Sequence, residues 1–495
     1  MSSDFFALLL LVPPWLAACS PQARAGVAPG VLLIAVDGLR ADHLALYGYD
    51  RDTSPTLSAL ARDGVRFEQV FASAPLLIPA HVALLTGCEP SQSRRYLPPE
   101  FEGLSERRWL VPEALPRPAI EFLAAGYATA AFVESELLSE AFGFDRGFQH
   151  YELLDPKGAQ AWEGPQDERV VDHLLQWLRA LAPTQPWFAY LELHQLERCW
   201  SVAGAAQEGY FQPRAELSQV PPVANTDSVF FAVPRSRWRG GVRSLGQYEA
   251  VYDDQIRGLD GEIGRLGALL RRLGRDEATT LHVVGAFGMQ LGEAGLYLCS
   301  GRYSLADLGV PWIVRPRANL TTLRGASLPG LISTLDVAPT VLALEGLSVP
   351  SGTHGHSQVE AMRLGVAHGE RPYVFASCGL QEGCAVIGER HVLEYLFPFT
   401  ANDAEQRRSW TGTWSEQTKQ TRLYFYDRLS TPFPMLAEGR LEHDAEAVPF
   451  RSAAVDWLRD MNDLRLYLQN PQGGPHLDES VVQRLREKGY AAGPR

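Results

Sequence analysis

The stretch VLLIAVDG, residues 31–38, decides the fold class of this 495-residue chain. A short, unbroken apolar run that ends at an acidic residue and a glycine is typical of a strand buried on both faces of a parallel sheet. Residues that carry out chemistry in such sheets gather at the carboxyl ends of the strands. Asp37, which directly follows the apolar run, is therefore the first candidate functional residue.

Similar apolar runs recur along the chain and alternate with helical patterns. Ser54 and Pro55 predict the start of a helix that Gly64 ends, with Ser54 as its capping residue. Apolar residues spaced by three and four predict amphipathic helices at residues 168–182 and 248–270. Further strands are predicted at residues 127–133, 187–193, 280–285 and 310–314. This alternation predicts an α/β domain with a mostly parallel sheet flanked by helices.

The pattern changes near residue 372, which predicts a large domain over residues 29–371 and a smaller subdomain over residues 372–495. Short strands are predicted at residues 373–377, 385–387, 391–396 and 423–426, and an amphipathic helix at residues 453–468. These elements predict an α+β subdomain with an antiparallel sheet. Residues 201–247 contain Pro and Gly without a clear period, which predicts a long surface loop.

The N-terminal residues predict export. An apolar run from Phe5 to Val12 is too short to cross a bilayer and suits a signal peptide, residues 1–19. Leu16-Ala17-Ala18-Cys19 resembles a bacterial lipobox, in which Cys19 is acylated, although the only charged side chain before it is Asp4. A signal peptide that is cleaved without acylation is the alternative. Both place the protein outside the cytoplasm, either secreted or held by a lipid anchor in the bacterial cell envelope, in the periplasm or at the outer membrane.

The net charge limits the expected partners, and the number of cysteines limits the possible disulfides. A net charge of -13 excludes nucleic acid as an expected partner, because phosphate binding requires a basic surface. Five of the six cysteines lie beyond Cys19, so disulfides leave at least one of them unpaired. Cys378 and Cys384 flank a glycine-containing turn and could form a local disulfide in an oxidising compartment. Two separate core thiols are the alternative.

Residues 36–87, VDGLRADHLALYGYDRDTSPTLSALARDGVRFEQVFASAPLLIPAHVALLTG, resemble the N-terminal signature block of the sulfatases in the alkaline phosphatase superfamily. The similarity continues in order through residues 261–273, 291–296, 335–346 and 485–490. This resemblance implies a large α/β domain that carries the active site and a small C-terminal α+β subdomain. Active members of the family hydrolyse sulfate esters with a calcium ion and a formylglycine made from Cys or Ser.

The chain departs from the family pattern at the nucleophile. Asp37 matches the first calcium-binding carboxylate, but the nucleophile position in the segment LIPAH, residues 77–81, is Leu77. An aliphatic side chain has no heteroatom that could attack sulfur or become an aldehyde hydrate. Pro79 and His81 match the family motif and set this register, and a slipped register with Ser73 as the nucleophile is the alternative.

Two groups of metal and proton-transfer positions are also replaced. The second metal half-site is expected after the strand at residues 280–285, where Ala286 and Phe287 stand in place of polar residues. Ala294 replaces the histidine of a common L-G-E-H-G segment. These side chains can neither ligate a metal nor carry a proton.

The last two positions are also altered. A histidine expected after the strand at residues 187–193 falls near Cys199, and Arg302 stands for an expected lysine. Calcium takes six to eight oxygen ligands, and Asp37 is the only protein ligand that the sequence assigns. We therefore expect neither a bound metal nor another cofactor.

Each of the following histidines has a structural alternative to a functional role. His81 either faces a bound anion or packs as a structural histidine beneath the site. His43 is expected to be a surface or structural residue. His354 and His356 resemble a metal pair, but glycine-rich loops commonly carry histidines that bind nothing. Asp37, in turn, either remains a metal ligand or caps the helix that follows its strand.

A basic segment is the main candidate for ligand binding. Arg235, Arg237, Arg239 and Arg243 surround Trp238 in the sequence RSRWRGGVR. Arginine forms charge-assisted hydrogen bonds to anions, and Arg and Trp are enriched at binding sites. The segment therefore suits an anionic glycan or a protein partner, with a solvated loop as the alternative.

Loss of the nucleophile together with the metal and proton-transfer groups predicts a pseudo-sulfatase, which acts by binding an anionic glycan or a protein partner. An active sulfuric ester hydrolase, or a related phospho-ester hydrolase, with relocated catalytic residues is the second hypothesis. A scaffold subunit that pairs with an active paralogue is the third. Function resides in the site rather than in the fold, so the fold cannot decide among them.

Overall fold

The computed structural model describes residues 26–93, 111–154, 166–198, 209–223, 232–238, 242–365, 371–379, 383–396, 422–429 and 445–469, together with Ser480 and Gln483. The predicted signal peptide, which contains Cys19, lies outside these ranges. So does the segment at residues 485–490, the last one that resembles the sulfatases. Among the described helices, none is both long and apolar enough to cross a membrane.

A nine-stranded sheet forms the centre of the described large domain, in the order β11-β2-β10-β6-β1-β5-β3-β4, with β9 beside β2. β1 is completely buried, as its apolar sequence predicts. The strands are β1 (Gly30–Asp37), β2 (Val65–Phe71), β3 (Ala128–Val133), β4 (His150–Leu153), β5 (Trp187–Leu193), β6 (Thr279–Phe287), β9 (Gly309–Val310), β10 (Trp312–Arg315) and β11 (Ala326–Ser333).

Most neighbouring strands in this sheet are parallel, which confirms the predicted fold class. β1 runs parallel to β5 and β6, and β3 runs parallel to β4 and β5. β10 is antiparallel to both β2 and β6. The single strand predicted at residues 310–314 is divided into β9 and β10 at Pro311, because proline has no N–H to donate to a sheet ladder.

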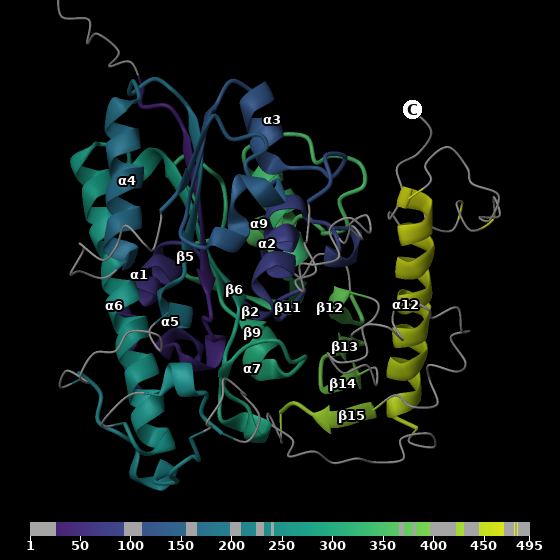
Figure 1. The fold of residues 1–495 in the computed structure, drawn as a ribbon. Coiled ribbons are helices and arrows are strands. Elements are labelled where there is room, and N and C mark those ends of the chain that lie inside the picture. The colour runs from purple at the N-terminus through teal and green to yellow at the C-terminus, as the bar shows by residue number, and fades with distance from the viewer. Residues whose placement is uncertain are drawn as a thin grey trace, which may run out of the picture.

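Helices cover both faces of the sheet (Figure 1). On one face, α1 (Pro55–Asp63), α4 (Gln166–Ala180) and α6 (Leu245–Arg272) pack against Leu32, Ile34 and Val36 of β1. On the other, α2 (Leu77–Thr86), α3 (Pro118–Ala124), α8 (Val337–Leu344) and α9 (Val359–Leu364) pack against Val31, Leu33 and Ala35. Successive side chains of β1 therefore contribute to two separate cores, each fully buried aliphatic side chain stabilising the fold by about 1.5–3 kcal/mol.

The first helix is capped differently from the prediction. Ser54 makes no side-chain hydrogen bond to the start of α1, and its hydroxyl accepts instead from the Ala45 N–H. The carboxylate of Asp260 on α6 accepts from the N–H groups of Thr56 and Leu57, both at 2.8 Å. A carboxylate from a distant helix thus satisfies the free N–H groups that a capping serine would otherwise take.

The C-terminal part forms the predicted antiparallel sheet. Its strands are β12 (Val374–Gly379), β13 (Gly383–Ile387), β14 (His391–Leu396) and β15 (Arg422–Asp427), paired in that order. Helix α12 (Ala447–Gln469) lies alongside this sheet, at the side of the molecule away from α6 (Figure 1). Phe450, Trp457 and Met461 of α12 form a core with side chains of β13 and β14.

The predicted disulfide between Cys378 and Cys384 does not form in the structure. Cys384 packs in the core under α12, whereas the N–H of Cys378 donates to the Tyr303 hydroxyl of the large domain. The register of β12 against β13 shifts between Ala376 and Gly379, beside the two cysteines. Both thiols are buried beside this irregularity, and a disulfide forms only within a narrow range of Cβ positions and directions.

Candidate functional site

Asp37 lies at the carboxyl end of the central strand and is fully buried. The register between β1 and β6 shifts after Val36, so that Asp37 lies opposite Phe287. Gly38 follows with a φ of 73°, and a Cβ at this position would lie 3.3 Å from Met289 and 3.4 Å from Leu196. The left-handed backbone and this close packing explain why position 38 is a glycine.

Two histidines hold the Asp37 carboxylate, one on each oxygen. His81 Nε2 lies 2.7 Å from Oδ1, and His194 Nδ1 lies 2.7 Å from Oδ2. His81 projects from the second turn of α2, and its Nδ1 is hydrogen-bonded to the Tyr190 hydroxyl of β5. His194 directly follows β5. The parallel order β6-β1-β5 brings these groups together at one edge of the sheet.

A second carboxylate, Glu192 of β5, faces the same group of side chains. Its Oε2 accepts from the N–H groups of Glu134 and Ser135 at 2.8 and 3.0 Å. Its Oε1 lies 3.7 Å from His194 Nδ1, beyond hydrogen-bond length. Glu192 is completely buried, so both of its oxygens are shielded from solvent.

The pKa values of Asp37, His81, Glu192 and His194 depend strongly on one another. Burial alone would raise the pKa of Asp37, but the imidazoles of His81 and His194 hold it well below its usual value. Burial and the nearby Asp37 charge raise the pKa of Glu192 to about 7. Burial would lower the pKa of His194, but its hydrogen bond to Asp37 and the surrounding carboxylates raise it to about 9. The pKa of His81 is raised chiefly by Asp37, against the effect of burial.

The predicted nucleophile position lies beside this group. Leu77 is the first residue of α2, one helical turn before His81, so the two residues share a face of the helix. Its half-buried side chain packs against the core on that face of the sheet. Ser73, the alternative nucleophile, is hydrogen-bonded to the hydroxyls of Ser333 and Thr334. Among the described residues, the side chains that contact the Asp37 carboxylate are the imidazoles of His81 and His194 and the carboxyl group of Glu192, and none is a hydroxyl or a thiol.

The remaining predicted positions are spread more widely. Ala286 and Phe287 end β6 and are buried in the core. Arg302 Nε donates to Glu394 of β14 at 3.4 Å, and its guanidinium lies over the Tyr424 ring. It therefore joins the large domain to the C-terminal sheet. Ala294 lies in the 3-10 turn Glu293–Gly295.

The predicted basic segment lies at the same edge of the sheet as Asp37. Arg237 donates to the Leu298 carbonyl and to Glu197, and Glu197 belongs to α5 (Gln195–Arg198), the helix that follows His194. Arg235 is exposed, and 46% of Trp238 is accessible to solvent. Of the other residues predicted from this part of the chain, Arg243 is exposed, whereas Arg239 and Cys199 lie outside the described residues.

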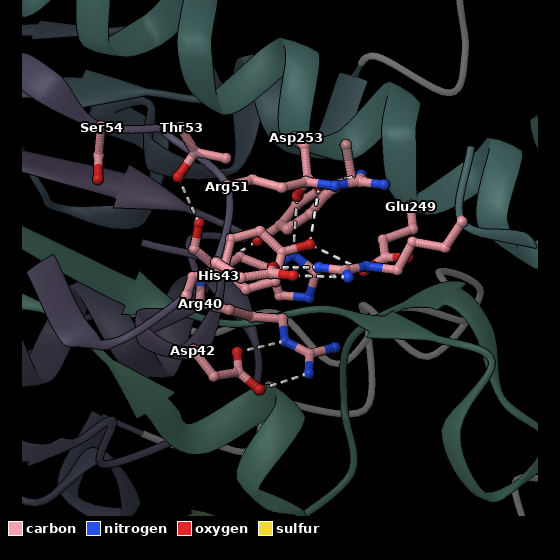
Figure 2. Close-up of polar contacts among 12 residues, drawn as sticks. Arg40, Asp42, His43, Arg51, Thr53, Ser54, Glu249 and Asp253 are labelled. Carbon is pink, nitrogen blue, oxygen red and sulfur yellow. Dashed lines mark hydrogen bonds and ion pairs between the residues drawn. The ribbon is translucent and has the colours of Figure 1, made fainter. Parts of the chain in front are cut away.

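A second buried polar cluster lies on α6 (Figure 2). Asp253 Oδ1 is hydrogen-bonded to His43 Nδ1 at 2.9 Å, and its Oδ2 accepts from Arg51 at 2.6 Å. Glu249 Oε1, one turn earlier on α6, accepts from Arg214 at 3.0 Å. Each carboxylate is therefore paired with a guanidinium, so the cluster has the composition of a structural ion network. His43 is a buried member of it, as one of its predicted roles requires.

His354 and His356 each contact a different set of side chains. His354 Nδ1 accepts from the Glu89 N–H at 3.1 Å, and its Nε2 is hydrogen-bonded to the Gln92 side chain. His356 lies beside the guanidinium of Arg371. These contacts favour the structural alternative for both histidines.

Two cavities lie at the opposite edge of the sheet. One, of about 320 Å³, is lined by Pro29 and Ala278, which precede β1 and β6. The other, of about 290 Å³, is lined by Ala128 and Gln185 near the starts of β3 and β5. Neither includes a residue of the Asp37 group, so neither extends the candidate site.

The calcium ion implied by the resemblance does not fit the residues present. Calcium is bound by six to eight oxygen atoms, commonly from several carboxylates. The described site offers two carboxylates, Asp37 and Glu192, and its other converging groups are the imidazoles of His81 and His194. Imidazole nitrogen is a poor ligand for a hard cation.

Sequence reasoning missed three members of this group: Tyr190, Glu192 and His194. The segment WFAYLEL, residues 187–193, contained a usable signal, because an acidic residue near the end of a buried apolar strand requires a compensating partner. The family pattern directed attention to Cys199 instead. The sequence therefore identified one carboxylate of a site that contains two.

The fold and the site define the class of protein. A large, mostly parallel sheet flanked by helices, together with a small C-terminal antiparallel sheet, is the fold of the alkaline phosphatase and sulfatase superfamily. The chain belongs to the Sulfatase family, whose sequence model matches residues 29–347.

Individual relatives agree with this assignment. Arylsulfatase A of Homo sapiens is 25% identical over 401 residues, covering 74% of this chain and 73% of the relative. N-acetylglucosamine-6-O-sulfatase of Bacteroides thetaiotaomicron is 22% identical over 437 residues, covering 72% and 75%. The solved phosphonate monoester hydrolase of Agrobacterium radiobacter has a TM-score of 0.63 at 17% identity, covering 88% of this chain and 96% of that one. The structural similarity therefore concerns the fold.

Proposed function

We propose that this chain is a non-catalytic member of the Sulfatase family that binds an anionic glycan at the cell envelope. The observation that carries the proposal is Leu77 at the start of α2, on the same helix face as His81. Sulfate-ester hydrolysis by this family requires a heteroatom nucleophile at that position, and an aliphatic group supplies none.

The replaced metal positions support the same conclusion. Ala286 and Phe287 contribute only apolar surface at the end of β6. The residues around Asp37 do not fit calcium, so the cation that neutralises a sulfate ester in active relatives has no suitable cage here. Loss of one catalytic group would leave weak activity, but loss of the nucleophile and the calcium site together removes the mechanism.

The exposed basic segment supports anion binding. Arg235 and Trp238 lie at the same edge of the sheet as the Asp37 group, and Arg237 is held in place by Glu197. A guanidinium recognises sulfate through charge-assisted hydrogen bonds, while an exposed indole offers a flat apolar face for a sugar ring. The name of one relative, N-acetylglucosamine-6-O-sulfatase, makes sulfated amino sugars suitable first probes.

We propose lipid anchoring through Cys19 as the route to the cell envelope. The supporting observation is the segment Leu16-Ala17-Ala18-Cys19 after an apolar run. Expression in bacteria with a radiolabelled fatty acid should label the wild type, and Cys19→Ala should remove the label. Equal labelling of the variant, or none of the wild type, would contradict the anchor.

The binding proposal is tested with purified protein and a sulfated glycosaminoglycan. Calorimetry should show saturable binding that Trp238→Ala and Arg235→Ala each weaken at least tenfold. The matched control is Arg272→Ala, an exposed arginine at the far end of α6. Equal affinity in all variants, or absence of binding by the wild type, would overturn the glycan proposal and leave a protein partner or an active paralogue to be sought by co-purification.

The non-catalytic proposal is tested separately. Nitrophenyl sulfate, nitrophenyl phosphate and a sulfated glucosamine should all remain intact during long incubation with the protein. Turnover that co-purifies with the protein and is lost in Asp37→Ala would instead support an active hydrolase with relocated catalytic residues.

A further inference from the structure

We propose that Asp37, His81, Glu192 and His194 form a site for one divalent transition-metal ion of the zinc type. The inference goes beyond the proposed function and does not depend on it, because a metal can bind here with or without turnover. It concerns a different ion and, apart from Asp37, different residues from the calcium positions that the resemblance implied.

The first support is the convergence of ligand types. The donor atoms of Asp37, His81 and Glu192 all lie within 4.8 Å of one another, and all three residues are buried. His194 lies outside this group of three, but its Nδ1 is 2.7 Å from Asp37 Oδ2 and 3.7 Å from Glu192 Oε1, so it is a candidate fourth ligand. Two imidazoles and two carboxylates suit zinc and its neighbours in the periodic table, which bind four or five such ligands at about 2.0–2.2 Å.

The second support is a buried carboxylate oxygen that faces this group. Glu192 Oε1 accepts no hydrogen bond from an N–H or hydroxyl group of the described residues, although the residue is completely buried beside the Asp37 carboxylate. A buried acceptor without a partner is costly, and a second carboxylate nearby makes it more so. A divalent cation between Asp37 and Glu192 would supply the missing partner and remove the repulsion.

The third support is the set of groups that orient the ligands. Tyr190 is hydrogen-bonded to His81 Nδ1, which leaves Nε2 directed at Asp37. The N–H groups of Glu134 and Ser135 hold Glu192 Oε2, which leaves Oε1 directed at the site. Metal-binding histidines and carboxylates typically have such outer hydrogen-bond partners, which fix the orientation of the ligating atom.

The cluster on α6 provides an internal comparison. His43, Glu249 and Asp253 also bring an imidazole and two carboxylates together. There, Arg51 already pairs with Asp253 (Figure 2). Arg214 pairs with Glu249, so a metal would have to displace guanidinium groups. Among the described residues, no lysine or arginine contacts the Asp37 or Glu192 side chains, which contact histidines and each other. Of the two clusters, the Asp37 group therefore has no described guanidinium or ammonium group that a metal would have to displace.

The experiment uses protein stripped with a chelator and then titrated with Co²⁺, whose visible absorption bands report nitrogen and oxygen ligation without any measure of activity. One equivalent of Co²⁺ should bind with visible bands, and Zn²⁺ should displace it while Ca²⁺ in large excess should not. His194→Gln, a change at the partly exposed end of the site, should weaken Co²⁺ binding at least 100-fold. Tyr190→Phe, which removes only an orienting partner, should weaken it about 10- to 100-fold.

His43→Gln is the matched control, because it alters a buried histidine of the α6 cluster and should leave the Co²⁺ affinity unchanged. Circular dichroism of each variant establishes that it is folded. Absence of visible bands in the wild type, unchanged affinity in folded His194→Gln, or equal displacement by Ca²⁺ would each overturn the metal proposal. The wild-type spectrum is decisive even where a variant does not fold.

Discussion

His81 Nε2 lies 2.7 Å from Asp37 Oδ1, although the two residues are 44 positions apart in the sequence. The contact joins the start of α2 to the end of the central strand. It occurs where active relatives are expected to hold calcium and a nucleophile, and here an imidazole faces the carboxylate beside an aliphatic residue. Several measurable properties of the protein depend on this arrangement and on other buried polar groups.

Replacement of Asp37 by Asn should destabilise the fold. Two imidazoles whose pKa values are raised by Asp37 would lose their counter-charge. Removing one partner of a buried ion pair typically costs about 3–5 kcal/mol, and we expect about 3 kcal/mol because the histidines can lose protons. Urea unfolding at pH 7 measures the loss, and NMR titration should show the pKa of His194 falling from about 9. An unchanged His194 pKa would contradict the assigned contact.

His282 should make the protein less stable in mild acid. This histidine lies in β6, fully buried, and burial lowers its pKa from 6.5 to about 3. The folded state therefore keeps it neutral, while the unfolded state binds a proton below pH 6.5, so stability is lost as the pH falls from about 6.5 toward 3.

The effect is isolated by comparing His282→Leu with the wild type. Between pH 7 and pH 5, the wild type should lose about 2 kcal/mol more unfolding free energy than the variant. Urea denaturation at both pH values provides the measurement. Parallel losses in the two proteins would show that His282 has an ordinary pKa in the fold.

Glu89 should produce the opposite pH dependence. Its carboxyl group is buried, which raises its pKa from 4.5 to about 8. A raised folded pKa favours the protonated form, so the associated stability is complete below pH 4.5 and is lost as the pH rises toward 8. Glu89→Gln removes this ionisable group. Its effect on the unfolding free energy should therefore be about 3 kcal/mol more stabilising at pH 7 than at pH 4. A gain of equal size at both pH values would exclude ionisation as its cause.

The distant cap of α1 can be tested by two single substitutions. Asp260→Ala removes the acceptor of the Thr56 and Leu57 N–H groups and should cost about 2–3 kcal/mol of unfolding free energy. Ser54→Ala removes one acceptor, from the Ala45 N–H, and should cost about 1 kcal/mol. Thermal or urea unfolding measures the loss of stability in each variant. A larger loss in Ser54→Ala than in Asp260→Ala would indicate that Ser54 is the capping residue.

The sequence was most informative where a local pattern sufficed. The apolar run before Asp37 and the segment at residues 187–193 predict β1 and β5, because a strand buried on both faces requires apolar side chains at successive positions. Helical spacing predicts α6 in the same way. The direction of β10 was not predictable, since parallel and antiparallel pairing depends on which distant strands become neighbours.

The site was only partly predictable for the same reason. Asp37, His81 and Leu77 belong to a motif, so their register could be assigned from the order of residues. Glu192 and His194 belong to no local pattern that names their partner. Their role follows from the order β6-β1-β5, which places the ends of β1 and β5 side by side.

The sequence by itself determined the fold class and the family, because these depend on residue types at fixed spacings, and it predicted an aliphatic residue at the nucleophile position. Only the tertiary structure decided what surrounds the Asp37 carboxylate, which groups cap α1, and that Cys378 and Cys384 remain separate. Those contacts join residues far apart in the chain or depend on local strand geometry. Their energies depend on distance and burial, which exist only after the strands and helices have packed.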